Sequence, residues 1–321
     1  MREKKLLDYY RNRFSLDPFL SVIDNSDFEK REFAFVLLNG RFIRNHSFAS
    51  PSSLLYFIQS RPLLHIYVGA VYNQPVSTKN PITKNRWKKR ELVFDLDLTD
   101  FDVGRKRSCG CQGGNAICYQ CWEMIKAGVY FIDESLRQDF GFQHIKWVFS
   151  GRRGVHAWIL DKQAAVLTTQ QRLTICNWVS LVKHKSEGLP KETLSQLPWT
   201  FSQRIVNLVI KPFLMNVTDD DLLELGIPPE YTTRFLALIR NQHISYQEII
   251  KLLTASIKGE IETQNKILKW WFPRIDNKVT IDTHRVLRMP GSIHGITGKP
   301  ATILDESQIE SFDPFSIHSI Y

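Results

Sequence analysis

Two aspartates, Asp95 and Asp97, lie in an apolar segment, residues 91–98, that has polar sequence on both sides. Its residue types favour a β-strand. Side chains alternate along a strand, so both carboxylates point to one face, roughly 7 Å apart. Two negative charges this close repel each other unless a cation lies near them, and carboxylate oxygens are suitable ligands for Mg²⁺. The pair therefore indicates a divalent-metal site, although an acidic pair on the solvent face of an edge strand, without any ligand, is also common.

Four of the five cysteines lie between positions 109 and 121. In a chain that stays inside the cell, such clustering favours metal binding over disulfides. Four thiolates complete a tetrahedral Zn²⁺ site, and the ligands would be Cys109, Cys111, Cys118 and Cys121. The glycines that allow tight turns here are Gly110, Gly113 and Gly114. Free buried thiols and a redox pair are the alternatives, and Cys176, inside an apolar helical stretch, is expected in the core.

A turn between glycines carries two adjacent arginines, with a serine before them and a histidine after them. Glycines let backbone N–H groups approach an anion, and arginine forks bind phosphate oxygens, to which a histidine can also donate. The residues are Ser150, Arg152, Arg153 and His156. The turn therefore predicts a phosphate site; an exposed arginine turn that binds nothing is the alternative.

The same residue types recur over residues 285–295. Arg285 and Arg288 precede glycines and His294, and two acids, Asp276 and Asp282, lie just upstream. Two clusters of this kind, together with a carboxylate strand and a basic overall charge, favour a site for a metal–triphosphate complex and a nucleic-acid strand.

Composition limits the class of protein. The 321 residues are 43% hydrophobic and 23% charged, which is ordinary for a soluble globular protein. No apolar run approaches the length of a membrane span, and the N-terminus lacks a signal-peptide core, so we expect an intracellular protein with no membrane partner. The net charge of +9 favours a polyanionic partner. Six Lys or Arg surround Trp87 in residues 79–90, a loop that either contacts nucleic acid or is simply solvated.

Strands and helices that would hold these residues follow from hydrophobic spacing. Helices are expected at 2–14, 51–61 and 122–140, the last ended by Gly141. Strands are expected at 64–72 and in two hairpins, 31–48 and 146–160, with Asn39-Gly40 as a two-residue loop in the first. Residues 168–272 have a helical pattern, and strand-like sequence returns at 278–281.

The chain resembles the catalytic (small) subunit of archaeo-eukaryotic DNA primases in segments 94–97, 150–156 and 276–294 and in the cysteines between the first two segments. The similarity runs in order from residues 31–33 to residues 312–315. It implies the α+β prim fold, a mixed β-sheet flanked by helices with an inserted zinc knuckle and a helical subdomain. The catalytic domain would comprise residues 1–167 and 273–321, with a zinc-binding insertion at about 105–122, and residues 168–272 would form the helical insertion.

This resemblance also implies residue roles. The two catalytic metals, Mg²⁺ or Mn²⁺, would be held by Asp95, Asp97 and Asp276. The triphosphate of the incoming nucleotide would be bound by Ser150, Arg152, Arg153, His156, Arg288 and His294. The nucleotide used in initiation would lie near Glu32 and Arg44, and the four cysteines would hold structural zinc. The sequence departs from relatives at Phe42, a tyrosine in the eukaryotic members, and at Arg288, a lysine in some. A two-residue loop at Asn39-Gly40 also places Glu32 and Arg44 on opposite faces of the hairpin, so a bulge or a different loop is needed for both to meet one ligand.

By resemblance, the function would be template-directed synthesis of short primers from nucleoside triphosphates on single-stranded DNA. The implied partners are a primase large subunit with an iron–sulfur cluster and, further, a replicative polymerase or helicase. The protein would work at the replication machinery, in the cytoplasm or nucleoid of an archaeon or in a eukaryotic nucleus. Two alternatives are a repair or end-joining polymerase with the same catalytic core, and a non-catalytic zinc-containing protein that binds nucleic acid.

Overall fold

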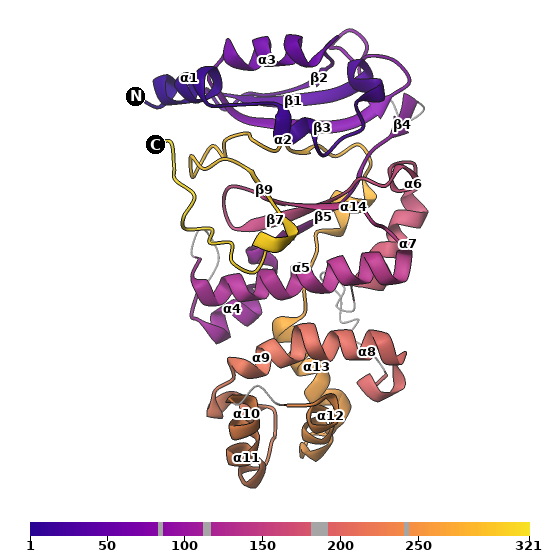
Figure 1. Cartoon of the computed structure of the whole chain (residues 1–321), viewed down its shortest axis with the longest axis vertical. Helices are drawn as coiled ribbons and strands as arrows, with labels where there is room; N and C mark the ends of the chain where they lie inside the picture. The colour runs from indigo at the N-terminus through magenta and orange to yellow at the C-terminus, as the bar shows by residue number, and fades with distance from the viewer. Residues whose placement is uncertain (83–85, 112–116, 181–191, 241–243) are drawn as a thin grey trace. The chain divides into compact units, whose positions relative to one another are not determined.

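The structure is a computed structural model that describes residues 1–82, 86–111, 117–180, 192–240 and 244–321 (Figure 1). Internal contacts divide the chain into two units. The first unit comprises Met1–Asp95, Phe142–Cys176 and Asp276–Tyr321, and the second comprises Leu96–Gly141 and Asn177–Ile275. The contacts thus group residues 96–141 with the helical segment, whereas the boundaries expected for the catalytic and helical domains stay a prediction.

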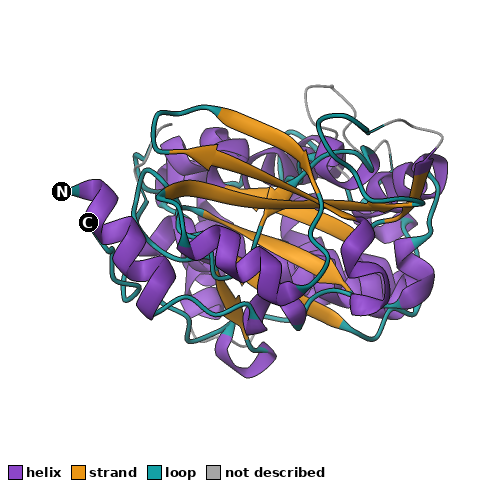
Figure 2. Ribbon diagram, turned by 90° about the horizontal axis from the view of Figure 1, so that it is seen from above, coloured by secondary structure: helices purple, strands orange, loops and turns teal. Residues whose placement is uncertain are grey.

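An antiparallel sheet in the first unit has the strand order β2-β1-β3-β4, with β8 also paired to β3 (Figure 2). Its strands are β1 (Arg31–Leu37), β2 (Phe42–His46), β3 (Leu63–Tyr72), β4 (Trp87–Lys89) and β8 (Leu287–Arg288). Helices α1 (Arg2–Asn12) and α3 (Pro51–Gln59) cover one face. Alternation along β1 buries Phe33 and Phe35 against these helices, and therefore turns Glu32 and Ala34 to the other face.

A second sheet in the same unit has the order β5-β7-β6-β9. Its strands are β5 (Leu92–Asp97), β6 (Ile145–Phe149), β7 (Gly154–Ile159) and β9 (Thr302–Leu304). Val93, Val148 and Trp158 from this sheet belong to the same hydrophobic core as Phe33 and Ile66 of the first. The sequence predicted one mixed sheet; the described strands instead form two, and their recorded registers are antiparallel. An apolar strand pattern shows that a segment pairs, but not with which neighbour.

The β1–β2 hairpin corrects the predicted loop. Leu37 N–H donates to the Arg41 carbonyl at 2.9 Å, and Phe35 pairs with Ile43, which leaves three residues rather than two in the loop. The register then shifts between Phe33 and Phe35. Asn45 adopts a left-handed conformation, φ 61°, at this bulge. The three-residue loop puts Arg44 opposite Ala34, and therefore on the same face as Glu32.

Residues 278–281, predicted as a strand, belong to a short helix, α14 (Asn277–Ile281). The Asp276 side chain accepts a hydrogen bond from Lys278 N–H at 3.0 Å and caps the helix. A local capping bond of this kind outweighs the strand preference of β-branched residues. Strand structure resumes only at β8.

The remaining helices confirm most of the pattern. Short helices are α2 (Asp17–Leu20), η1 (Asn25–Lys30), η3 (Leu98–Phe101), α4 (Asp102–Ser108), α6 (Lys162–Ala165) and η6 (Glu306–Gln308). Helix α5 (Tyr119–Phe140) ends at Gly141, φ 74°, as predicted. The helical segment holds α7 (Thr169–Val179), η4 (Leu194–Gln196), α8 (Trp199–Ile205), η5 (Val206–Ile210), α9 (Lys211–Met215), α10 (Asp219–Glu224), α11 (Pro229–Arg240), α12 (Tyr246–Ala255) and α13 (Glu260–Trp271).

The core of the second unit is built on α5. Phe131 from this helix packs against Phe201 and Phe272, with ring centroids 6.0 Å and 4.9 Å apart. Over the described parts of the chain, every helix is too short or too polar to cross a membrane.

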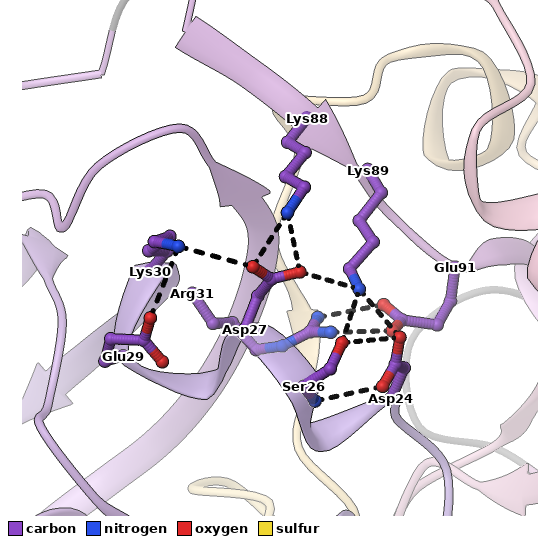
Figure 3. A network of polar contacts seen from close by, with 9 residues as sticks. All are labelled: Asp24, Ser26, Asp27, Glu29, Lys30, Arg31, Lys88, Lys89 and Glu91. Atoms are coloured by element: carbon purple, nitrogen blue, oxygen red, sulfur yellow. Dashed lines mark hydrogen bonds and ion pairs between the residues drawn. The ribbon is translucent and has the colours of Figure 1, made fainter.

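A polar network ties η1 to β4 in the first unit (Figure 3). Lys88 contacts both carboxylate oxygens of Asp27, at 2.8 and 3.0 Å, and Lys89 contacts Asp24 at 2.7 Å and Asp27 at 2.9 Å. Hydrogen bonds from Lys89 and from Ser26 lower the pKa of Asp24 to about 2. Both lysines belong to the basic loop, so two of its six positive charges are neutralised within the protein. Lys84 of that loop lies outside the described residues.

Beneath this network, Arg31 and Glu91 form a buried ion pair with two parallel hydrogen bonds of 2.9 and 2.7 Å (Figure 3). Burial raises the pKa of Glu91, but the Arg31 guanidinium more than offsets this and holds it below its usual range. Arg31 also donates to the Gly69 carbonyl at 3.0 Å, so the pair links β1, β3 and the start of β5.

We predict that Glu91→Ala lowers the free energy of unfolding by about 3–5 kcal/mol, because it leaves the Arg31 charge buried without a partner. Glu29→Ala is the control, since the Glu29 side chain is partly exposed and pairs with Lys30 at 3.4 Å, and it should change stability by less than about 1 kcal/mol. Urea denaturation measures both. Arg31→Met combined with Glu91→Leu should be less damaging than Glu91→Ala; equal effects of Glu91→Ala and Glu29→Ala would contradict the assignment.

Candidate active site and cysteine cluster

The turn between β6 and β7 is held in a fixed shape by its own backbone. Ser150 N–H donates to the Gly154 carbonyl at 2.9 Å, and Gly154 N–H donates to Ser150 Oγ at 3.3 Å. Gly151 has φ 83°, a left-handed conformation that favours glycine. The two arginines, Arg152 and Arg153, therefore project from a rigid hairpin tip, and His156 follows on β7.

The tertiary structure brings this turn against the second arginine–histidine segment. A Cβ atom on Gly151 would lie 2.7 Å from the Lys299 carbonyl oxygen and 3.1 Å from Cβ of His294. Thr297 Oγ1 donates to the Gly151 carbonyl at 2.6 Å. The two motifs, separated by more than a hundred residues in sequence, thus form one surface, as their shared chemistry predicted.

Arg288 reaches this surface from β8, where it pairs with Tyr67 of β3. Its guanidinium lies 2.6 Å from His65 Nδ1 and 5.6 Å from the centre of the Tyr67 ring. The His65 and His294 rings are 5.4 Å apart. Sequence analysis missed His65 and Tyr67, because neither stands in a recognisable motif; only the alternation of β3 could have placed both on one face.

Positive charge is concentrated here. Burial, then Arg288, His65, Arg152 and Arg153, lower the pKa of His294 to about 2. Burial, then Arg288 and Arg2, lower the pKa of His65 to about 3. Both histidines are therefore neutral at pH 7, and the charge is carried by the arginines. Such a cluster favours an anion, because an anion relieves the repulsion among the cations.

The predicted metal ligands lie on two elements. Asp95 on β5 has its Oδ1 atom 3.5 Å from His156 Nε2, and its carbonyl accepts a hydrogen bond from Asp276 N–H at 3.1 Å. Asp97, the last residue of β5, accepts hydrogen bonds from Thr99 N–H and Oγ1 at 2.9 and 2.8 Å. Asp95 and Asp276 are thus adjacent through their backbones.

A cation already contacts one of these acids. Arg285 donates to Asp276 Oδ2 at 2.8 Å, and both side chains are partly exposed. Sequence analysis noted Arg285 only as a member of an arginine pair and did not assign it to Asp276. The contact shows that Asp276 faces a position where positive charge is favourable, which is what a metal ligand requires.

Glu32 and Arg44 meet on the face of the first sheet that is turned away from α1 and α3. Arg44 donates to both oxygens of Glu32 at 2.9 Å and to the His284 carbonyl at 2.8 Å. Gly69 is required beneath them, because a Cβ there would lie 2.7 Å from Glu32 Oε2. The Glu32 hydrogen bonds raise the pKa of Arg44. Register places Tyr67 and Arg288 on this same face.

Four cysteine sulfurs of the second unit lie within 4.8 Å of one another: those of Cys109, Cys111, Cys118 and Cys121. Cys118 caps α5 and accepts a hydrogen bond from Cys121 N–H at 3.4 Å. Burial raises the pKa of the Cys121 thiol, but Arg105 and the other cysteines lower it to about 7 overall. Gly110 has φ 71°, whereas Gly113 and Gly114 lie outside the described residues. Cys176 is buried in the core, as expected.

Within the described ranges, these cysteines are the one group of three or more acidic, histidine or cysteine residues gathered that tightly. The donor set suits a metal that prefers thiolate ligands in a tetrahedral arrangement. Asp95, Asp97 and Asp276 offer hard oxygen ligands, which suit Mg²⁺ or Mn²⁺.

Known proteins resemble the chain over most of its length. The sequence model of the DNA primase small subunit family matches residues 94–306. The DNA primase small subunit of Caenorhabditis elegans is 30% identical over 95% of this chain and 82% of its own length. The DNA primase small subunit of Saccharomyces cerevisiae is 26% identical over 93% of this chain and 80% of its own length. That of Thermococcus kodakarensis is 27% identical over 96% of this chain and 88% of its own length.

The matched range contains residues 94–97 of β5, the β6–β7 turn, the cysteine cluster and the Arg288–His294 segment. The relatives include both eukaryotic and archaeal proteins. The chain is a member of the DNA primase small subunit family.

Proposed function

We propose that this chain is the catalytic subunit of a DNA primase and synthesises short primers from nucleoside triphosphates on a single-stranded DNA template. The observation that carries the proposal is the joining of the Gly151 turn to the His294 loop beside Asp95, in a chain of this family. The activity is that of a DNA-directed nucleotidyltransferase. A primase large subunit is the proposed constitutive partner, and a replicative polymerase or helicase a further one.

The arginine–histidine surface would bind the triphosphate. Arg152, Arg153 and Arg288 carry fixed charge, and Ser150 and the turn backbone offer short-range donors. His156 and His294 would each donate to a phosphate oxygen. Because these groups are held by the hairpin and by β8 before the nucleotide arrives, little reorganisation is needed as charge develops on the leaving pyrophosphate.

Asp95, Asp97 and Asp276 would hold the catalytic Mg²⁺ or Mn²⁺ ions. The fit is supported by the all-oxygen donor set and by Arg285, whose guanidinium occupies a cation-favouring position at Asp276. When bound, such ions lower the pKa of the attacking 3′-hydroxyl and neutralise charge on the phosphates. His156, 3.5 Å from Asp95, links the carboxylates to the triphosphate surface. Glu32 and Arg44 would hold the nucleotide that starts the chain.

A zinc ion on the four cysteines would have a structural role. Cys118 and Cys121 lie at the start of α5, so the ion would tie the loop before this helix to its first turn. The prim fold with this zinc knuckle and a helical insertion is the finer description that we propose for the chain. Its catalytic domain would comprise residues 1–167 and 273–321.

Primer synthesis without a pre-existing end is the experiment that tests the function. The protein, alone and with a large subunit, is given single-stranded DNA, nucleotides and Mg²⁺ or Mn²⁺. New chains started without a primer support the primase. Extension of added ends only would favour a repair or end-joining polymerase, and DNA binding without any nucleotide transfer would favour a non-catalytic protein.

Asp95→Asn should reduce nucleotide incorporation by at least about 100-fold, because it removes a negative ligand from the metal site. The change is nearly isosteric, so the fold should survive, and Mn²⁺ binding followed by electron paramagnetic resonance should weaken in parallel. Asp17→Asn, at an exposed helix start, is the control and should leave both measurements unchanged. Near-normal incorporation by Asp95→Asn would show that Asp95 is not a ligand of the catalytic metals.

His294→Gln should weaken nucleotide binding and abolish part of the proton uptake that accompanies it. The free histidine is neutral because its pKa is about 2, and a bound phosphate favours its protonated form, so wild-type affinity should rise as pH falls towards 6. Calorimetry in two buffers of different ionisation enthalpy measures this uptake. The exposed His144, changed to Gln, should behave as wild type; identical proton uptake by the His294 variant and wild type would refute the assignment.

Purified protein should contain about one Zn²⁺ per chain. Cys118→Ser should lose the zinc and lower the melting temperature, because one ligand and the α5 cap interaction are disturbed. Cys176→Ser, in the core, is the matched control and should keep its zinc even if it is less stable. Elemental analysis measures the zinc content of both variants, and full zinc content in Cys118→Ser would exclude Cys118 as a ligand.

A further inference from the structure

Helix α1 carries a concentration of positive charge in the first unit. Residues 2–13 hold five basic and two acidic side chains. One side of the helix is buried through Leu6 and Tyr10, which join the core beneath the first sheet. The basic side chains lie elsewhere on the helix surface; Arg2, Lys4, Arg11 and Arg13 are exposed and Lys5 is partly so.

Several other basic residues of this unit are engaged within the protein. Lys88 and Lys89 pair with Asp24 and Asp27, and Arg31 pairs with Glu91. Arg90 and Arg172 are buried and donate to backbone carbonyls. By contrast, no acidic group among the described residues lies within ion-pair distance of Lys4 or Lys5. In the loop at 79–90, which sequence analysis considered for nucleic-acid contact, Lys88 and Lys89 are therefore already neutralised.

Two hollows lie along α1. One, of about 490 Å³, is lined by Met1, Arg2, Lys5, Ile296 and Tyr321. The other, of about 460 Å³, is lined by Met1, Glu3, Lys4, Leu7, Asp8, Arg11 and Asn12. Each combines apolar carbon with basic side chains at its edge. This is the combination that receives an unpaired base while its phosphate lies against a cation.

The first hollow contains an aromatic ring next to an arginine. The Arg2 guanidinium lies 4.7 Å from the centre of the Tyr321 ring, and the two ends of the chain lie side by side in both views (Figures 1 and 2). Ile296, at the hollow's edge, exposes 59% of its surface. Guanidinium and aromatic faces both stack on bases without regard to sequence.

The same surface is continuous with the proposed triphosphate site. Tyr9 Oη donates to the Gly291 carbonyl at 2.8 Å, and Arg2 donates to the Gly295 carbonyl. Ile296 stands two residues after His294. A strand lying along α1 would therefore reach the loop that carries His294 without leaving the first unit.

We propose that the α1 surface, formed by Arg2, Lys4, Lys5, Arg11, Ile296 and Tyr321, binds the single-stranded DNA template next to the nucleotide site. Its role as a template surface rests on the proposed primase function, whereas its binding of single-stranded DNA does not. The contacts are to phosphates and base faces, so binding is independent of sequence, as a primase template requires.

The test is the double variant Lys4→Gln and Lys5→Gln, which removes two charges without internal ion pairs and keeps good helix formers. A fluorescein-labelled oligo(dT) of roughly 20 nucleotides is titrated by anisotropy between about 50 and 200 mM salt. Loss of two phosphate contacts should reduce the slope of log K against log salt by about 1.4 and weaken binding about 10-fold or more near 0.1 M salt.

The matched control is Lys146→Gln with Lys162→Gln, which removes the same charge from exposed positions on β6 and α6. It should change the slope little, and nucleotide affinity should be the same in both variants. An unchanged slope and affinity in the α1 variant, or an equal loss in the control, overturns the proposal, as does a loss of nucleotide affinity instead. If the wild-type protein makes no primers, the proposed function is wrong, but the test of DNA binding by the α1 surface remains valid.

Discussion

The close approach of Gly151 to the loop at 294–299 is the contact on which the site depends. A side chain at this position would collide with the Lys299 carbonyl, so the glycine lets the β6–β7 turn lie directly on the second segment. The Thr297 hydroxyl then bonds to the Gly151 carbonyl. Without this contact, Arg152 and Arg153 would belong to an isolated hairpin tip, and His294 to a separate loop.

Bringing these motifs together places several cations in one partly buried region. The protein tolerates this by keeping His65 and His294 neutral, since burial and neighbouring arginines lower the pKa of both. His65 can then accept a hydrogen bond from Arg288 rather than repel it. The result is a site whose arginines are positioned before any ligand arrives, which favours binding of an anion with several charges.

Charge is distributed differently elsewhere in the first unit. On β4 the lysines are neutralised by aspartates of η1, and the buried Arg31–Glu91 pair fixes the strands beneath them. On α1 the lysines lack such partners within the described structure. The net charge of +9 does not reveal which basic residues are neutralised within the protein and which are not.

Local sequence determined most of the elements and the chemistry of the motifs. Alternation placed Asp95 and Asp97 on β5, Gly141 ended α5, and the spacing of four cysteines indicated the cluster that the structure gathers. These features depend on neighbours within a few residues, which sequence periodicity records directly. The family motifs added the proposed roles of residues that no periodicity could assign.

Tertiary structure decided which elements meet. Two sheets formed instead of one, and the pairing of β1 with β2 across a three-residue loop put Arg44 on the face of Glu32. His65 and Arg285 joined the site only through β3 pairing and a short helix. A hydrophobic pattern states which face of an element is buried, but the partner of that face depends on the packing of residues far apart in the chain.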